Sequence, residues 1–385
     1  MPERARLSIV VLTKNEERRI AGCLESVRWA DELIVVDGLS TDRTVEICRR
    51  YGARVISRAF SGDFGVERNV GNDAATGDWI LQLDGDDTVS EALRAQIEDI
   101  LRRGAPYLAY NIRRKNWFLG HEMRYGGWYH YYPHFFRRGQ AHFEGRVHHL
   151  LKAKGTLGTL EGAVEHRPFD SLDLFIRRHN RYTSIEAQEV LDTQGVLDPA
   201  LVRYRIYVKP LKLIRKTLIK KAGWREGWYG FIFAILYAWV DVMRWAKYQE
   251  LADRAARGET VPSSLLTGPE TAVAQFVDEQ NLATTEAAAR MLAEGPRPAR
   301  WTIFAQLTWR ARRVHREALA RRRRAHGRTP EADLEALLDL FAHMLRWVKC
   351  WERTRPVPPD GGPGRTPGDS SLPTEGMTCQ ATSAR

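Results

Sequence analysis

The sequence predicts an α/β protein whose core is a Rossmann-like, mostly parallel sheet with helices on both faces. Between residues 7 and 87, short apolar runs rich in β-branched residues alternate with stretches of helical spacing. Polar side chains stand directly after several of these apolar runs. This alternation is typical of βαβ units, in which helices cover both faces of the strands.

Four strands and three helices follow in order along this region. Unbroken apolar runs predict strands over residues 7–12, 33–37, 53–57 and 79–83. Apolar residues at helical spacing predict helices over residues 16–28, 41–51 and 65–76. From about residue 106 to 170, aromatic residues and short alternating runs predict hairpins and loops laid over the sheet.

The remainder of the chain is expected to be mostly helical. Residues 171–194 and 262–350 show helical spacing, and no internal repeat is evident in the sequence. From Arg355 onward the chain is rich in Pro, Gly, Ser and Thr. Such a composition predicts disorder, because it offers little apolar surface to bury.

The positive charge of the chain is concentrated in two later stretches. The whole chain has 59 Lys and Arg against 48 Asp and Glu, a formal charge of +11. Residues 203–225 hold nine Lys or Arg and no acid, and residues 310–328 hold nine Arg and one acid, Glu317. Because the rest is slightly acidic and carries no recognised nucleic-acid motif, we expect no specific nucleic-acid partner.

The spacing of the cysteines and the first apolar run of the chain indicate the cellular compartment of the protein. The four cysteines are scattered without CxxC spacing, which is typical of a reducing compartment rather than of a metal knuckle. The first apolar run, residues 7–12, is too short for the core of a signal peptide. We therefore interpret it as the first strand and expect a cytoplasmic protein.

Polar side chains follow three of the four predicted strands. They are Thr13, Asn15 and Glu16 after the first strand, Asp37 at the end of the second, and Asp84, Asp86 and Asp87 after the fourth. Ligands bind outside the carboxyl ends of the strands in an open parallel sheet. The sequence lacks both GxGxxG after the first strand and GxxxxGK[ST], the usual glycine-rich phosphate cradles. A nucleotide would therefore be held here by carboxylates.

Asp84 and Asp86 are the candidate ligands of a metal ion. Two carboxylates one residue apart at a strand end can share Mg²⁺ or Mn²⁺, which completes its shell with water and substrate phosphates. The cation then neutralises charge on a diphosphate leaving group. The alternative is a solvated turn, but the position directly after a buried strand favours a ligand site.

Several segments resemble a known family. LTKNEE, WADELIVVDGLSTDRTVEI and ERNVGNDAATGDWILQLDGDD are similar to family 2 glycosyltransferases of the GT-A fold. The closer likeness is to the lipopolysaccharide core β-1,4-glucosyltransferases, supported by GGWYHYYPHFFRRG, GRVHH, EHRPFDSLDLFIRRHNRYT, KAGWREGWYG and KYQE. The likeness spans roughly residues 6 to 250.

The resemblance implies an inverting, metal-dependent hexosyltransferase. It would move a sugar, glucose by this likeness, from a UDP-sugar to a lipid-linked or core-oligosaccharide acceptor. By the same resemblance, the residues that line the base and ribose of the nucleotide are Thr13, Asn15, Glu16 and Asp37. Those near the donor are Arg68 and Asn69, and those that bind the sugar diphosphate through the metal are Asp84 and Asp86.

At the position where the family has its natural candidate for the general base, this sequence departs from the family's pattern. The subgroup usually reads Val-His-Glu where this chain has Val147, His148 and His149. A base must take the proton of the acceptor hydroxyl, and His149, Glu144 and Asp87 are the candidates. The alternatives are two partly exposed imidazoles on a hairpin, and a changed or lost activity.

The segment formed by residues 203–225 and 228–240 is predicted to face a membrane. Residues 228–240 are uncharged but too short to span a bilayer, for which about 20 residues are needed. Beside the basic residues 203–225, they are typical of an interfacial anchor on an anionic membrane surface. A helix packed in the protein core is the alternative. The first interpretation predicts a peripheral protein on the inner face of the cytoplasmic membrane.

The chain is accordingly divided into five parts. These are the nucleotide-sugar-binding half of the GT-A domain (1–105), the acceptor-binding half (106–200), the membrane-association helices (201–255), a helical extension (256–354) and a disordered tail (355–385). Two rival functions remain open at this point. One is a nucleotidyltransferase on a similar sheet, and the other is a degenerate transferase that binds a glycolipid or polyanion.

Overall fold

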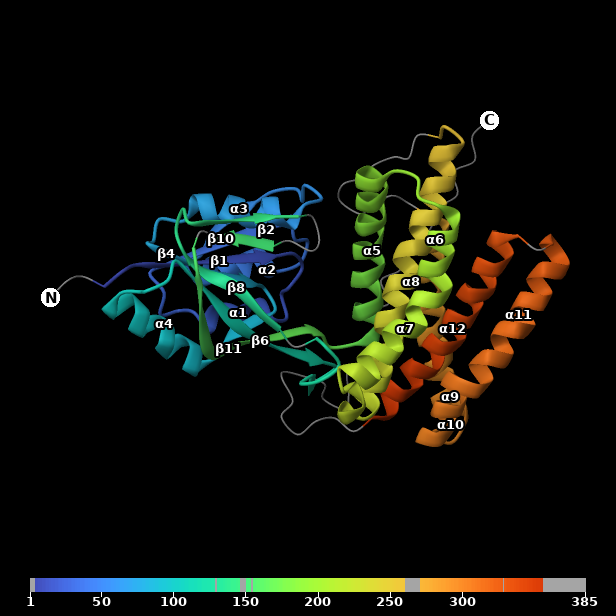
Figure 1. Cartoon of the computed structure of the whole chain (residues 1–385). Helices are drawn as coiled ribbons and strands as arrows, with labels where there is room; N and C mark the ends of the chain where they lie inside the picture. The colour runs from blue at the N-terminus through green and yellow to red at the C-terminus, as the bar shows by residue number, and fades with distance from the viewer. Residues whose placement is uncertain are drawn as a thin grey trace, which may run out of the picture.

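The computed structural model describes residues 4–128, 130–145, 150–153, 155–259, 271–327 and 329–355. They form a sheet domain followed by a helical bundle, shown from blue to green and from green to red in Figure 1. The bundle begins with α5, which leads directly out of the last strand of the sheet.

Nine strands form the main sheet of the described residues. They are β1 (Leu7–Thr13), β2 (Glu32–Asp37), β3 (Arg54–Ser57), β4 (Trp79–Asp84), β5 (Asp87–Val89), β6 (Ala109–Phe118), β7 (His121–Glu122), β8 (His130–Arg137) and β11 (Leu157–Phe169). Their order is β3-β2-β1-β4-β8-β6-β11-β5, with β7 beside β6. A separate two-stranded sheet pairs β9 (Ala141–Glu144) with β10 (Leu150–Ala153).

The expected parallel strands are confirmed. β1, β2, β3 and β4 pair in parallel, and four helices accompany them: α1 (Ile20–Glu25), α2 (Thr44–Arg50), α3 (Phe64–Ala74) and α4 (Glu91–Arg103). The register places Thr13 beside Asp37 and Leu12 beside Asp84. The polar ends of three strands therefore meet at one edge of the sheet.

The prediction that residues 106–170 lie over the sheet as hairpins is wrong for most of this segment. β6, β8 and β11 are inserted into the main sheet, where β8 runs antiparallel to β4. The reason lies in the aromatic residues: Phe135 and Phe136 are fully buried, and the ring of Phe135 stacks on Trp79 at 4.8 Å. Burial of these rings requires that their strand be central in the sheet.

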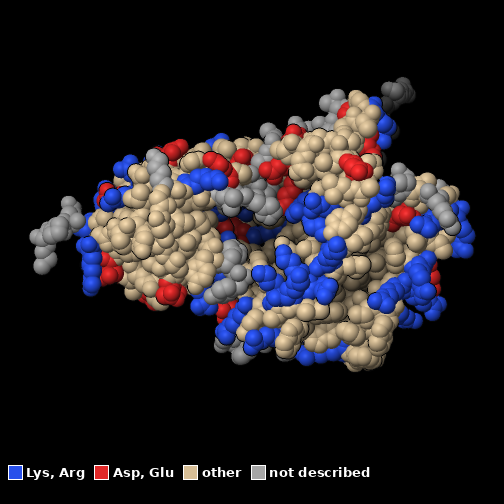
Figure 2. All heavy atoms as spheres, viewed as in Figure 1, with Lys and Arg blue, Asp and Glu red and all other residues tan. Residues whose placement is uncertain are grey.

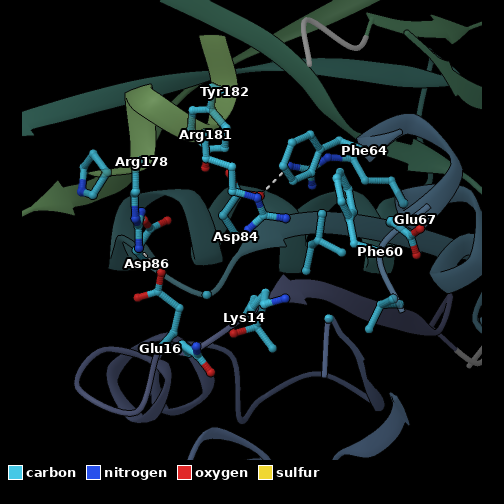
Figure 3. Close-up of a pocket in the computed structure, with 18 of the residues that line it drawn as sticks. Lys14, Glu16, Phe60, Phe64, Glu67, Asp84, Asp86, Arg178, Arg181 and Tyr182 are labelled. Atoms are coloured by element: carbon cyan, nitrogen blue, oxygen red, sulfur yellow. Dashed lines mark hydrogen bonds and ion pairs between the residues drawn. The ribbon is translucent and has the colours of Figure 1, made fainter. Parts of the chain in front are cut away.

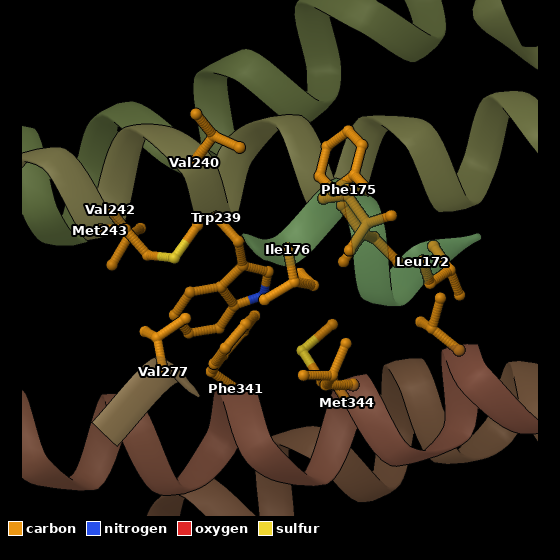
Figure 4. Close-up of a cluster of buried hydrophobic side chains, with 14 of the residues drawn as sticks. Leu172, Phe175, Ile176, Trp239, Val240, Val242, Met243, Val277, Phe341 and Met344 are labelled. Atoms are coloured by element: carbon orange, nitrogen blue, oxygen red, sulfur yellow. The ribbon is translucent and has the colours of Figure 1, made fainter. Parts of the chain in front are cut away.

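The second half of the chain is a bundle of helices. They are α5 (Leu172–Gln194), α6 (Pro199–Arg203), α7 (Lys209–Arg215), α8 (Trp228–Ala256), α9 (Ala272–Glu294), α10 (Arg300–Ala305), α11 (Ala311–His326) and α12 (Pro330–Thr354). Single π-helical turns follow α6, α7 and α10. Figure 4 shows side chains of α5, α8, α9 and α12 converging on one apolar core around Trp239 and Phe341.

The apolar run at residues 228–240 belongs to this core. Ile232, Ala234 and Leu236 are almost completely buried, so the structure favours the core-helix alternative for this run. Among the described residues, no helix combines the length and the hydrophobicity that a membrane crossing requires.

The bundle contains an internal repeat that the sequence reasoning missed. In α8, the buried ammonium of Lys247 donates to Asn180 of α5, 2.6 Å from Nζ to Oδ1. In α12, Lys349 donates in the same way to Asn281 of α9, also at 2.6 Å. The surrounding sequences agree, with RWAKYQE at 244–250 and RWVKCWE at 346–352.

A second pair of contacts follows the same repeat. The carboxylate of Glu250, at the end of α8, accepts from the backbone N–H of Ala272 at the start of α9, at 2.8 Å. The equivalent Glu352 of α12 accepts from the backbone N–H of Leu172 at the start of α5, at 2.8 Å. The unit α5–α8 is thus repeated as α9–α12, and each copy caps the first helix of the other.

We expect Lys247→Met to lower the free energy of unfolding by about 1–3 kcal/mol, because the acceptors on Asn180 and the hydroxyls of Thr183 and Ser184 lose their common donor. Burial lowers the pKa of Lys247 to about 7. Since the unfolded lysine keeps its proton up to about pH 10.5, the wild type gains stability as the pH rises above 7, on the order of 1 kcal/mol per pH unit. The loss caused by Lys247→Met should therefore grow between pH 7 and 9.

Urea unfolding at several pH values measures both effects. Lys220→Met is the matched control, because Lys220 is exposed. A midpoint for Lys247→Met equal to that of the control would contradict the role given to the buried lysine.

Candidate active site

A pocket of about 430 Å³ lies at the carboxyl ends of β1 and β4, with α5 on its far side. Figure 3 shows its side chains, which come from the sheet, from α3 and from α5. The polar lining residues are Thr13, Lys14, Asn15, Glu16, Glu67, Arg68, Asp84, Asp86, His166, Arg178, Arg181 and Tyr182.

Gly85 allows the two aspartates to approach β1. A Cβ atom on this residue would lie 2.8 Å from the hydroxyl oxygen of Thr13 and 3.3 Å from Cγ of Glu16. Any side chain here would push the β4 end away from the β1 end. The glycine between Asp84 and Asp86 is therefore a requirement of the close packing between the two strand ends.

Arginines from three elements surround the two aspartates. Arg68 of α3 and Arg114 of β6 contact Asp84, the latter at 2.8 Å, and Arg178 of α5 contacts Asp86 at 2.9 Å. Burial alone would raise the pKa of Asp84, but Arg68 and Arg114 outweigh burial and hold it well below its ordinary value. Asp84 is thus a permanent anion.

His166 presents a lone pair to Asp86. Burial, with a further contribution from Arg114, lowers the pKa of His166 to about 3, so the imidazole is neutral. Its Nδ1 lies 2.7 Å from Oδ1 of Asn116, whose amide N–H donates to the carbonyl of Trp128. Nδ1 therefore carries the proton, and the Nε2 lone pair faces Oδ1 of Asp86 at 3.6 Å.

Nε2 of His166 and Oδ1 of Asp86 are two acceptors that face each other without a proton between them, so a cation bound between them would be stabilised by both. Ligand atoms of Asp84, Asp86, Asp87 and His166 all lie within 4.8 Å of one another. Carboxylate oxygens are the ligands that Mg²⁺ and Mn²⁺ prefer, and an imidazole nitrogen beside them suits a transition-metal ion such as Mn²⁺ better than Mg²⁺. These residues could hold a divalent cation, and His166 was not among those that the sequence predicted.

The third aspartate of the cluster is turned inward. Asp87 accepts from the backbone N–H of Asp84 at 2.9 Å and from Arg114 at 3.0 Å. Burial raises its pKa to about 7. It is not among the residues that line the pocket, and its contacts hold the turn after β4 in place.

The residues after β1 occupy the floor of the pocket. Glu16 is buried between Arg19, at 2.8 Å, and Arg178, and burial followed by the charge of Asp86 raises its pKa to about 7. The hydroxyl of Thr13 is buried and has no hydrogen-bond partner among the described residues. Asn15 has a positive φ of 55°, and its side-chain oxygen accepts from the backbone N–H of Thr41 at 2.8 Å.

Asp37 and Asn69 do not line the pocket. The carboxylate of Asp37 is buried and accepts from the hydroxyl of Ser40 at 2.5 Å and from its backbone N–H at 3.1 Å. It thereby fixes the loop after β2. Asn69 exchanges two hydrogen bonds of 2.9 Å with the backbone of Phe143, which ties α3 to β9.

The remaining candidates for the general base, Glu144 and His149, are not among the described residues that line the pocket. Glu144 is mostly exposed at the end of β9, where it contacts His142 at 2.8 Å, and it does not line the pocket. His149, with Val147 and His148, falls outside the described residues.

Aromatic residues form the wall opposite the aspartates, as Figure 3 shows. The rings of Phe60 and Phe64 lie 4.6 Å apart, Phe64 lies 5.9 Å from Tyr182, and the guanidinium of Arg181 stands over Phe60 at 5.2 Å. The arrangement offers an apolar surface on one side and charged groups on the other. It can hold a ligand that has both a ring and a phosphate-like part.

Comparison with known proteins identifies the first part of the chain. Residues 8–153 match the family model of glycosyl transferase family 2. An uncharacterized glycosyltransferase of Rickettsia typhi is 27% identical over 261 residues, which are 64% of this chain and 88% of that protein. The lipopolysaccharide core biosynthesis glycosyltransferase LpsC of Rhizobium meliloti is 24% identical over 268 residues, 65% of this chain and 94% of LpsC.

Among solved structures, S. aureus TarS in complex with UDP-GlcNAc aligns with a TM-score of 0.31 and 18% identity. The alignment covers 66% of this chain and 92% of the TarS chain.

We expect His166→Ala to weaken Mn²⁺ binding by at least about tenfold, because the Nε2 lone pair that faces Asp86 is lost. Titration calorimetry on the full chain measures this affinity without any substrate. The matched control is His142→Ala, which removes an exposed imidazole outside the pocket. Equal Mn²⁺ affinities for the two variants would exclude His166 as a ligand.

Proposed function

We propose, from the premise that this chain is a glycosyltransferase with a family 2 domain of the GT-A fold, that it transfers a sugar from a UDP-sugar to a membrane-associated glycan. The transfer inverts the configuration at the anomeric carbon and depends on a bound divalent cation. The sugar is glucose and the acceptor a lipopolysaccharide core in this proposal. The observation that supports it most is the juxtaposition of Asp84, Asp86 and His166 at the carboxyl end of β4.

The diphosphate of the donor would lie between this cluster and α5. A bound Mg²⁺ or Mn²⁺, held by Asp84 and Asp86 and, in the case of Mn²⁺, by His166, would neutralise the charge that develops on the leaving diphosphate. Arg178 and Arg181 line the same pocket, and guanidinium groups bind phosphate oxygens through paired hydrogen bonds. Arg178 also keeps Asp86 in position before the donor binds.

The nucleoside would occupy the side of the pocket formed by the ends of β1 and β2. Thr13, Asn15 and Glu16 line this side and offer a hydroxyl, an amide and a carboxylate. Asp37 does not line the pocket and would act on the nucleoside site indirectly, because its hydrogen bonds with Ser40 shape the loop that follows β2. Arg68 supports Asp84 and closes the pocket, whereas Asn69 acts only through the α3–β9 contact.

Inversion requires a base on the acceptor side. The acceptor oxygen attacks the anomeric carbon, the bond to the diphosphate oxygen breaks, and the hydroxyl proton passes to the base. Among the described candidates, Asp87 is engaged by Arg114 and by the backbone of Asp84, and Glu144 is exposed beside His142. We therefore keep His149 as the proposed base.

The acceptor and the location follow from two further observations. LpsC, a relative along most of its length, is named for lipopolysaccharide core biosynthesis. In addition, the exposed basic residues of the bundle would face an anionic surface. The enzyme would accordingly work in the cytoplasm as a peripheral protein on the inner face of the cytoplasmic membrane.

We expect the wild type to release UDP from UDP-glucose in the presence of Mn²⁺ and a lipopolysaccharide core acceptor, and His149→Gln to lower this rate by at least about a hundredfold, because the acceptor loses its base. Glu144→Gln should stay within about threefold of the wild type. Each rate is measured as UDP release across a panel of UDP-sugars.

The same assay separates the rival outcomes. If Glu144→Gln shows the loss and His149→Gln does not, the base is wrongly assigned while the reaction stands. If no UDP-sugar is consumed, or if Asp86→Ala keeps full activity, the proposed reaction itself is refuted.

A further inference from the structure

A second hollow lies in the helical bundle, away from the pocket of the sheet domain. It is an apolar groove of about 680 Å³ whose floor is formed by α8 and α12. One wall is formed by Pro210, Leu211 and Ile214 of α7, and the other by the π-helical turn that contains Trp309 and by the start of α11. A groove of this volume matches the usual range of small-ligand sites, roughly 300–1,000 Å³.

The internal repeat builds this groove. Ile235, Ala238 and Val242 of α8 line its floor, and so do Leu337, Leu340 and Met344 of α12. Each residue of the first set stands 102 positions before its counterpart in the second, the same spacing as between Lys247 and Lys349. The groove therefore lies where the two copies meet, and each copy supplies half of the floor and one wall.

Both walls of the groove carry positive charge. Lys212 and Arg215 on α7 and Arg312 and Arg316 on α11 are all exposed. Among the residues that the structure describes, no contact ion pair involves Arg215, Arg312 or Arg316. Figure 2 shows Lys and Arg gathered in two groups over the helical half, with uncharged surface between them.

Apolar side chains at the rim of the groove are open to solvent. Leu211 is 67% exposed and Trp309 is 59% exposed, although both line the groove. Exposed aliphatic and indole groups beside unpaired basic residues are characteristic of proteins that enter the interface of an anionic bilayer.

We propose that this groove takes up one acyl chain of an anionic phospholipid, whose headgroup phosphate lies between the basic residues of α7 and α11. This proposal rests on the membrane location of the proposed acceptor and adds the site that holds the enzyme there. It differs from the expected anchor, because residues 228–240 contribute to the floor of a binding site and do not themselves enter the lipid.

The charge and the apolar floor of the groove favour an anionic lipid over two other possible occupants, a second copy of the chain and residues 356–385. A second copy of the chain would bring its own basic walls, so like charges would meet. Residues 356–385 contain only Val357, Leu372 and Met377 as aliphatic or thioether side chains larger than alanine and proline, too few for a groove with a long apolar floor. A hydrocarbon chain with an anionic head matches both the floor and the walls.

The test is a calorimetric titration of the full chain with a lysophosphatidylglycerol of about 14 carbons, kept below its critical micelle concentration. We expect saturable one-to-one binding that Leu211→Asp weakens by at least about tenfold, because a carboxylate would stand at the apolar rim. The matched control is Leu282→Asp on α9, since Leu282 is 64% exposed and does not line the groove. Arg312→Glu should weaken binding in the same direction.

Two results would overturn the proposal. One is equal affinity in Leu211→Asp and Leu282→Asp. The other is no saturable binding by the wild type, which is also what a groove filled by a second copy or by the chain itself would give. Because neither leucine lines the pocket of the sheet domain, both variants should keep wild-type UDP-sugar consumption. Saturable lipid binding in a chain that consumes no UDP-sugar would refute the proposed function and leave the lipid site standing.

Discussion

The site depends on the electrostatic compensation of carboxylates that are packed together at the strand ends. Asp84, Asp86 and Glu16 are brought close by the parallel register and by the glycine between the two aspartates. An uncompensated buried carboxylate costs several kcal/mol, so such a cluster persists only with partners of opposite charge. Arg178 supplies one of them and contacts both Asp86 and Glu16, which links the bundle to the sheet.

This compensation explains why the site is assembled from distant parts of the chain. Arg68 comes from α3, Arg114 from β6 and Arg178 from α5, and each contacts a carboxylate of the cluster. The sheet domain alone would lack the third arginine. The helical bundle is therefore part of the pocket, in addition to carrying the groove that we propose as a lipid site.

The sequence allowed the first half of the sheet and the aspartates to be predicted, because both depend on local patterns. Unbroken apolar runs mark strands buried on both faces, and polar residues at their ends mark the ligand-binding edge. His166 and Arg178 were missed, because they reach Asp86 only through long-range contacts: the pairing of β11 with β5 sets His166 opposite Asp87, and the first turns of α5 bring Arg178 to the pocket. The repeat was missed because few positions, such as Lys247 and Lys349, are shared across some hundred residues.

The central claim is that α5 completes a binding site for a nucleotide diphosphate at the carboxyl ends of β1 and β4. Titration of the wild type and of Arg178→Gln with UDP, in the presence and absence of Mn²⁺, tests it most directly. The account predicts Mn²⁺-dependent UDP binding that Arg178→Gln weakens by at least about tenfold, since a guanidinium that contacts Asp86 is lost. Equal UDP affinity in both proteins, or affinity independent of Mn²⁺, would contradict it.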